Sequence, residues 1–126
     1  MVIFPLEWKI KYVLDEHILY VKTKGRVTAD AANSMVKDIV EAAACHLCDR
    51  QIVDHRNSVF AFGLFEYYER PDINMKIGIS RRWKIAMVFS ELSKNTYFME
   101  TVFRNRGYNF RQFDDIEKAR NWLLGK

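Results

Sequence analysis

The sequence of 126 residues contains two cysteines, and it has no apolar run long enough to cross a bilayer. Cys45 and Cys48 are too close together to form the disulfide framework of a secreted domain, so their spacing fits a reducing cytoplasm. The first residues also lack the basic stretch followed by a longer apolar segment that marks an export signal. We therefore expect a cytoplasmic protein, with peripheral attachment to a membrane as an alternative.

Internal repeats, low-complexity tracts and long linkers are also missing, which argues against several domains. A chain of this length that is 49% hydrophobic can bury one substantial core without help from disulfides or metal ions. We predict a single domain over residues 1–126.

The chain has no large excess of one charge, but its net charge of +4 is unevenly distributed. Residues 1–63 contain 8 lysines and arginines against 8 acids, whereas residues 64–126 contain 12 against 8. Such asymmetry can attract phosphates or an anionic bilayer. Because acids are interspersed among the basic residues, ordinary solvated surface is the favoured interpretation, and we expect no nucleic-acid binding.

The first third of the chain predicts a β-hairpin followed by a helix. Residues 8–14 and 18–24 alternate between apolar and polar side chains on either side of a short polar turn. Gly25 is expected to end the second strand. Thr28 is a suitable N-cap for a helix whose apolar residues recur at helical spacing as far as Leu47.

Strands and helices then alternate to the end of the chain. Further strands are predicted at residues 51–53, 83–89 and 108–113. A short helix starting near Gly63 is limited by Pro71, and later helices start at Ser93 and at Asp114, which forms a capping box with Glu117. Because strand–helix–strand units pair in parallel, we predict an α/β fold with a mixed, mostly parallel five-stranded sheet and about four helices.

This order of elements resembles the SpoIIAA-like or STAS family, the fold of anti-sigma-factor antagonists. Four stretches carry the resemblance, namely Gly25-Arg-Val-Thr, Val53-Asp-His-Arg, Trp83-Lys-Ile-Ala-Met-Val, and Phe113 with Ala119 and Trp122-Leu123. They look like the uncharacterised SpoIIAA-like branch and span nearly the whole chain. The specificity of the match comes from their order and spacing.

The resemblance implies a regulatory role, but one motif of the signalling members is missing. Those members carry a phosphorylatable Ser or Thr at the start of the second helix. Here the region reads Phe60-Ala-Phe-Gly-Leu-Phe, and Ser58 lies upstream. Because a phosphate needs a hydroxyl, this sequence argues against a phosphorylation switch. The family also contains members thought to take up lipophilic or nucleotide ligands, and the aromatic second helix suits a lipophilic ligand.

Asp54, His55 and Arg56 follow a buried strand and are the first candidates for a polar site. A carboxylate beside a histidine can fix its tautomer for proton transfer. Adjacent residues of a strand point to opposite faces, however, so Asp54 and Arg56 share a face and His55 points away. An ion pair between Asp54 and Arg56 is therefore the favoured interpretation, and we predict no catalytic residue.

Cys45-His-Leu-Cys48 has the spacing of half a zinc or redox site, with His46 and His55 as conceivable further ligands. A second cysteine pair is missing. Free cysteine is a common small buried residue, so structural thiols are favoured, and we predict no metal and no cofactor.

The densest basic cluster is Arg81-Arg82-Trp83-Lys84, which begins a predicted strand. It could meet a lipid headgroup or a nucleic-acid backbone. Solvated arginines beside a tryptophan that covers the end of the sheet are the favoured alternative.

Apolar side chains in the second-helix region exceed what one short helix needs to bury. They are Phe60, Phe62, Phe65, Tyr67, Tyr68, Ile73, Met75 and Ile77. They line a pocket, form an interface or pack into the core, and an exposed apolar patch requires a ligand, a second subunit or a bilayer to cover it.

We predict a non-catalytic module that binds a lipophilic small molecule or a membrane surface through this region. Its apolar walls are Phe60, Phe62, Phe65, Tyr68 and Met75, and its contacts to an anionic head are Arg56, Arg81 and Arg82. The alternative is a regulatory module for a protein partner, related to anti-sigma-factor antagonists but without the phosphorylatable residue. A homodimer also remains an alternative.

Overall fold

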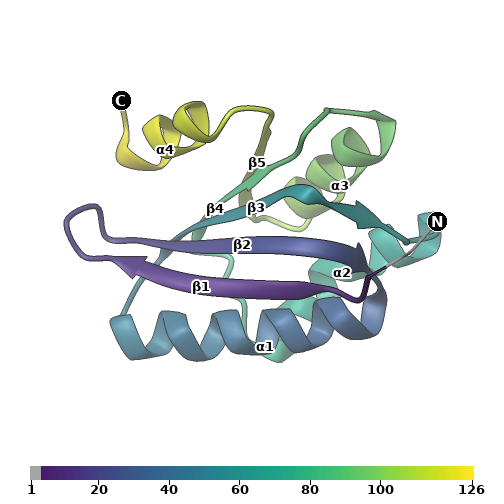
Figure 1. Ribbon diagram of the computed structural model, residues 1–126, viewed down its shortest axis with the longest axis horizontal. Helices are drawn as coiled ribbons and strands as arrows, with labels where there is room; N and C mark the ends of the chain where they lie inside the picture. The colour runs from purple at the N-terminus through teal and green to yellow at the C-terminus, as the bar shows by residue number, and fades with distance from the viewer. Residues whose placement is uncertain (1–3) are drawn as a thin grey trace.

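The computed structural model describes residues 4–126 and contains one five-stranded sheet and four helices (Figure 1). The strands are β1 (Glu7–Val13), β2 (Ile18–Val27), β3 (Arg50–Phe60), β4 (Lys84–Val88) and β5 (Asn109–Phe113). The helices are α1 (Ala29–His46), α2 (Leu64–Ile77), α3 (Lys94–Asn105) and α4 (Ile116–Leu124). The predicted α/β fold class is confirmed.

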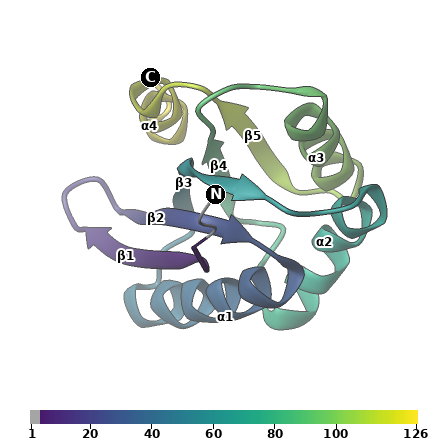
Figure 2. The ribbon, with the colours of Figure 1, turned by 45° about the vertical axis from the view of Figure 1, so that its right-hand side comes forward.

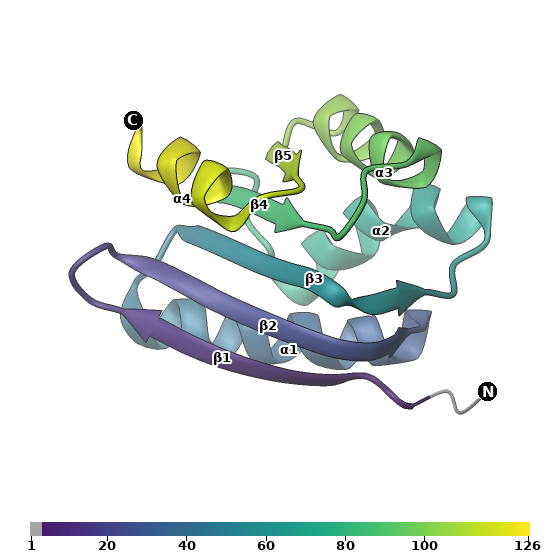
Figure 3. The same cartoon turned by 45° about the horizontal axis from the view of Figure 1, so that its top comes forward.

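The strands lie in the sheet in the order in which they occur in the chain. β1 and β2 form an antiparallel hairpin, and β2, β3, β4 and β5 pair in parallel. Because every right-handed crossover advances by one strand in the same direction, α1, α2 and α3 cover one face of the sheet. α4 follows the last strand and packs on the other face, against β3, β4 and β5 (Figure 3).

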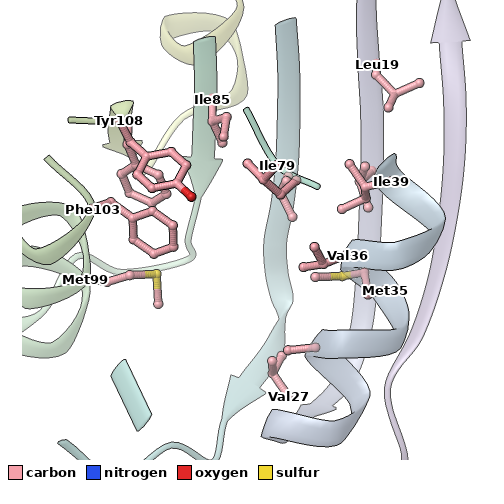
Figure 4. Close-up of a cluster of buried hydrophobic side chains, with 14 of the residues drawn as sticks. Leu19, Val27, Met35, Val36, Ile39, Ile79, Ile85, Met99, Phe103 and Tyr108 are labelled. Atoms are coloured by element: carbon pink, nitrogen blue, oxygen red, sulfur yellow. The ribbon is translucent and has the colours of Figure 1, made fainter. Parts of the chain in front are cut away.

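Each face of the sheet has its own apolar core. The main core lies between the sheet and α1 to α3, and Figure 4 shows Leu19 and Ile39 on one side of it and Phe103 and Tyr108 on the other. The smaller core lies under α4. It consists of Ile18, Ile52, Ala86, Val88, Phe113, Ala119 and Leu123. Neighbouring strand residues such as Ile18 and Leu19 therefore belong to different cores, as the two-residue period of a strand requires.

β2 continues past Gly25, so the prediction that this glycine ends the strand was wrong. Gly25 has φ +109°, and a Cβ at this position would lie 2.4 Å from the carbonyl oxygen of Pro5. The segment before β1 returns here, where the Arg26 N–H donates to the Phe4 carbonyl over 3.0 Å. Gly25 thus permits a close approach of two backbones.

β3 is longer than the predicted strand over residues 51–53. It pairs with β2 from Gln51 to Phe60, with an irregularity between Lys22 and Lys24 where β3 contributes an extra residue. Such a bulge lets pairing continue while it changes the direction of the side chains. The polar residues from Asp54 to Ser58 consequently lie within the strand.

The predicted helix ends were confirmed in α1 and α3 and need two corrections elsewhere. Thr28 accepts from Ala31 N–H, and Ser93 accepts from Thr96 N–H. Pro71, however, lies inside α2. It is buried, and its carbonyl accepts the Tyr108 hydroxyl over 2.8 Å, so tertiary contacts hold the helix together there.

The N-cap of α4 is Asp115, which replaces the predicted Asp114. Its carboxylate accepts from the N–H groups of Glu117 and Lys118, over 2.8 and 3.3 Å. The carboxylate therefore binds the first turn directly, without the Glu117 side chain that the predicted capping box needs.

Candidate functional site

The aromatic side chains around the start of α2 form an inward set and an outward set. Phe60, Phe62 and Tyr67 point inward and contact the main core. The Phe60 ring lies 5.4 Å from the Phe62 ring in an edge-to-face arrangement and 6.3 Å from the Tyr67 ring. These rings stabilise the join between β3 and α2.

The outward set forms what we call the α2 stripe, which consists of Leu64, Phe65, Tyr68 and Met75. Their exposed fractions are 69%, 69%, 52% and 44%. Tyr68 follows Phe65 by three residues and Leu64 by four, and Met75 follows Tyr68 by seven, so the four side chains lie on one side of the helix. Four large apolar side chains on one helix face are typical of an interaction surface.

The lower half of the stripe borders an open groove of about 450 Å³. Met75, Asp72, Arg81 and Arg106 contribute to its walls. The Arg106 guanidinium lies 4.6 Å from the centre of the Tyr68 ring, donates to the Tyr68 carbonyl over 3.2 Å and pairs with Asp72 over 3.7 Å. Arg106 thus connects α3 to α2 beside the stripe.

The side chains that accompany the stripe on α2 are mainly acidic. Glu66, Glu69 and Asp72 stand against Arg70 and Lys76 in this helix. Arg70 points inward and is 4% exposed. The outer surface of α2 is therefore apolar and acidic.

Arg70 forms a buried link between helices that sequence patterns did not identify. Its guanidinium donates to the side-chain oxygens of Asn33 in α1 (2.7 Å) and Asn74 in α2 (2.6 Å). Burial lowers the pKa of Arg70, because its charge is partly removed from water. The spacing of Arg70 within the helix could have predicted that it points inward, away from the neighbouring acids. It could not have predicted that Asn33 and Asn74 accept its hydrogen bonds.

A cavity of about 40 Å³ lies between the sheet and the inward aromatic set. Its walls include Met35, His55, Phe60, Phe62 and Arg70. Small-molecule sites usually enclose roughly 300 Å³ or more. This cavity has room for a few water molecules at most, so it does not accommodate a lipophilic ligand as it stands.

The structure confirms that Asp54 and Arg56 share one face of β3 and that His55 points to the other. The Asp54 carboxylate accepts from Nε and Nη2 of Arg56, each over 2.9 Å. Burial alone would raise the pKa of Asp54, but the hydrogen bonds and charge of Arg56 outweigh that effect and lower it. Asp54 therefore cannot orient the imidazole of His55.

His55 belongs to a buried hydrogen-bond cluster. Its Nδ1 lies 2.7 Å from the Thr23 hydroxyl, which in turn lies 2.6 Å from the Ser58 hydroxyl and donates to the Asp54 carbonyl over 3.1 Å. Burial lowers the pKa of His55 to about 4. The imidazole is neutral at pH 7, and its contact with Thr23 stabilises the pairing of β2 with β3 at the bulge.

The three arginines predicted to meet one anionic head lie in different places. Arg56 is bound to Asp54 on the face of the sheet opposite α2. Arg81 and Arg82 precede the start of β4, whereas Arg56 lies beyond the residues that pair with the end of β4. Arg81 lies beside Met75 in the open groove, but neither Arg81 nor Arg82 lies beside Arg56.

The two cysteines are free thiols in different environments. Cys45 is exposed, and Cys48 is buried with its Sγ 3.2 Å from the Arg50 carbonyl and 3.5 Å from the His17 carbonyl. Across residues 4–126, no three His, Cys, Asp or Glu side chains are grouped as metal ligands. Cys48 thus helps to fasten the start of β3 to the hairpin turn.

The start of α2 offers no hydroxyl for a phosphate. Its N-cap is Gly63, whose N–H donates to the Glu66 side chain over 3.0 Å. Ser58 lies in β3, where its hydroxyl is bound to Thr23. In the described part of the chain no helix is both long and apolar enough to span a bilayer.

The α/β fold described above is a SpoIIAA-like fold, as comparison with solved structures shows. One similar structure is an uncharacterised protein from the DUF3478 family with a SpoIIAA-like fold, from Shewanella loihica PV-4. It has 16% sequence identity and a TM-score of 0.57, over 94% of this chain and 93% of that one.

A second similar structure is the anti-sigma factor antagonist SpoIIAA in its unphosphorylated form. It has 12% identity and a TM-score of 0.54, over 95% of this chain and 98% of that chain. Neither the protein-family models nor the curated proteins gave a match to the sequence. The predicted SpoIIAA-like fold is therefore confirmed by structure.

Proposed function

We propose that the protein is a cytoplasmic, non-catalytic binding module that holds a protein partner on the α2 stripe. The observation that carries this proposal is the exposure of Leu64, Phe65, Tyr68 and Met75 along one face of one helix. A helix whose apolar face inserts into a groove of a partner is a common mode of protein recognition.

The charges around the stripe favour a protein over a lipid surface. Anionic bilayers repel acids, and Glu66 and Glu69 lie on the same helix, whereas Asp72 is paired with Arg106. The cavity behind the inward aromatic set is also too small for an enclosed lipophilic ligand. A partner with an apolar groove and a basic rim would complement both features of α2.

The similar anti-sigma factor antagonist supports the same class of function. An anti-sigma factor antagonist acts on another protein, and SpoIIAA shares this fold over nearly its whole length. In our chain Gly63 occupies the start of α2, so the proposed binding does not depend on phosphorylation there.

A photo-crosslinking amino acid at position 65 tests the proposal in the host cell. We expect it to capture a protein, which mass spectrometry then identifies. The same amino acid at position 47 is the control, because Leu47 is 85% exposed at the end of α1 and lies outside the α2 stripe. Equal capture from both positions would argue against a specific surface.

The purified partner then allows a quantitative test. Phe65→Asp should weaken its binding by about 30-fold, as for a central interface residue that contributes roughly 2 kcal/mol. Leu47→Asp should leave the affinity unchanged, and both variants should remain folded because both side chains are exposed. Unchanged binding by Phe65→Asp, or a lipid that copurifies with the wild type and is lost from this variant, would refute the protein-partner proposal.

A further inference from the structure

The half of the sheet that α4 leaves uncovered is strongly basic. No helix lies in front of β1 and β2 in Figure 3, whereas α4 lies over the β4 side of the same face. The charged side chains of β1 and β2 are exposed and include five cations and one acid, Glu7. The cations, which we call the basic sheet face, are Lys9, Lys11, Lys22, Lys24 and Arg26.

The register of the hairpin places one pair of like charges directly opposite each other. Lys9 lies opposite Lys22, whereas Glu7 lies opposite Lys24. Within residues 4–126, none of the five cations has an acidic side chain within ion-pair distance. Like charges at directly opposed positions destabilise a sheet, and a bound anion would remove that repulsion.

The basic sheet face also has a groove and two apolar neighbours. Lys9, Lys22 and Lys24, together with Glu7, line an open groove of about 350 Å³. Val59 pairs with Arg26 on this face and is 71% exposed. Leu14 is 77% exposed in the turn between β1 and β2, which projects past the end of α1 (Figure 2).

The aromatic rings of the hairpin are not free to stack on nucleic-acid bases. The Trp8 indole N–H donates to Asp38 of α1 over 2.9 Å. The Tyr20 hydroxyl donates to Glu16 over 2.7 Å. Proteins that bind single strands usually offer exposed rings in a basic groove, whereas lysines with apolar side chains at the margin suit an anionic bilayer.

The difference in charge between the basic sheet face and α1 also favours an anionic bilayer as the binding surface. α1 lies behind the sheet and carries Asp30, Asp38 and Glu41 against Lys37. α2 adds the acids beside its stripe. A negatively charged surface would therefore attract the basic sheet face and repel α1, which lies directly behind it.

We propose that the basic sheet face binds the surface of an anionic phospholipid bilayer. The lysines contact the headgroups, and Leu14 and Val59 reach toward the acyl boundary. This role goes beyond the proposed function, because the α2 stripe lies on the other side of the sheet. Both surfaces can thus be occupied at the same time.

Vesicle flotation with the full chain tests the inference. We expect binding to phosphatidylserine-rich vesicles, little binding to phosphatidylcholine vesicles, and weaker binding as salt is added. Lys9→Gln with Lys22→Gln should weaken binding by about 25-fold, since each lysine near an anionic surface contributes about fivefold. Lys37→Gln with Lys94→Gln is the control, because it removes the same charge from α1 and α3 and should leave binding unchanged.

Two further measurements separate the alternatives. Urea unfolding of the Lys9/Lys22 double variant should show at least wild-type stability, which excludes misfolding as the cause of lost binding. Phe65→Asp should keep full vesicle binding, so failure of the α2 proposal leaves this one standing. No vesicle binding at low salt, an equal loss in the control variant, or binding to single-stranded nucleic acid in place of vesicles would overturn the proposal.

Discussion

His55 shows how a polar residue becomes structural when its surroundings satisfy one ring nitrogen and exclude water. It is 2% exposed, and the hydroxyl of Thr23 contacts its Nδ1. A charged imidazole would be poorly solvated in this position, so the folded protein favours the neutral ring.

The pKa of His55 predicts a pH dependence of stability. The pKa is about 4 in the folded protein and 6.5 when the ring is exposed. The unfolded chain therefore binds the extra proton first as the pH falls, and the free energy of unfolding decreases between pH 6.5 and pH 4. The decrease should total roughly 3 kcal/mol. Urea unfolding across this range measures it.

Two histidine variants test whether His55 causes this pH dependence. His55→Gln should lose most of the slope between pH 6.5 and pH 4.5, although it starts from a lower stability. His46→Gln should keep the slope, because His46 is exposed at the end of α1. An unchanged slope in His55→Gln would show that another group takes up the proton. Asp54 and Glu16 have lowered pKa values, so their contribution to stability is lost only at more acidic pH.

Gly25 cannot be replaced by a residue with a side chain for two separate reasons. Its positive φ disfavours any Cβ, and the Pro5 carbonyl occupies the place where that Cβ would lie. Gly25→Ala should lower the free energy of unfolding by about 2–4 kcal/mol, measured by urea unfolding.

Gly125→Ala separates the two causes. Gly125 also has a positive φ, of +75°, but a Cβ there would meet nothing within 4 Å. We expect this variant to lose about 1 kcal/mol, from φ alone. Equal losses at both positions would show that the contact with Pro5 is unimportant.

At the scale of elements, α1 and α2 are joined by a buried charge without a carboxylate partner. The guanidinium of Arg70 relies on the oxygens of Asn33 and Asn74. Asn33→Ala should lower the free energy of unfolding by about 1.5–3 kcal/mol, because a buried charged donor then loses its acceptor. Thermal or urea unfolding measures the loss.

Ser34→Ala provides the matched change on the neighbouring residue of α1. Ser34 is exposed, and its hydroxyl donates to the Asp30 carbonyl within the helix. This variant should stay within about 0.5 kcal/mol of the wild type. If Asn33→Ala is equally mild, water replaces the lost oxygen and the link is weaker than the contacts indicate.

Most elements could be predicted from the sequence, because local signals decide them. Thr28 and Ser93 bind the first N–H groups of their helices whatever the rest of the chain does. Pro71 and the length of β3 could not be predicted, because distant residues decide both. Tyr108 binds the carbonyl of Pro71, and β2 pairs with the polar half of β3.

The candidate site could be predicted only in part for a similar reason. The aromatic content of residues 60–68 identified an unusual segment, and α2 does expose Phe65 and Tyr68. Phe60 and Phe62 precede α2 and point inward, whereas Phe65 and Tyr68 point outward from it, so the predicted single pocket wall is two surfaces. Which rings point outward depends on the residue at which α2 begins, and the first residue of a helix is difficult to predict from the sequence.

At the scale of the whole molecule, the basic sheet face and the α2 stripe lie on opposite sides of one sheet. The sequence places the excess of cations in residues 64–126, yet the basic sheet face comes from residues 9–26. Alternate lysines in both strands of the hairpin were the available signal. Whether these lysines form an exposed surface depends on which part of the sheet α4 covers. The position of α4 follows from the position of the last strand.

The two cores should unfold together, although the smaller core lies under a single short helix. Its strand residues Ile18, Ile52 and Ala86 are neighbours of Leu19, Val53 and Ile85, which belong to the main core. Loss of α4 would expose apolar side chains on the same strands that support the other face. The sheet therefore couples the two cores.

Leu123→Ala tests this coupling. Leu123 is 2% exposed in the smaller core, so its truncation should lower the free energy of unfolding by about 2–4 kcal/mol. Helix signal and tryptophan fluorescence should still change at the same urea concentration, with an unchanged m-value. Leu64→Ala is the control, since Leu64 is 69% exposed and its truncation should have an effect below about 0.5 kcal/mol. Two separate transitions in Leu123→Ala would mean that α4 unfolds alone, because the main core would then persist without the helix that covers its strands.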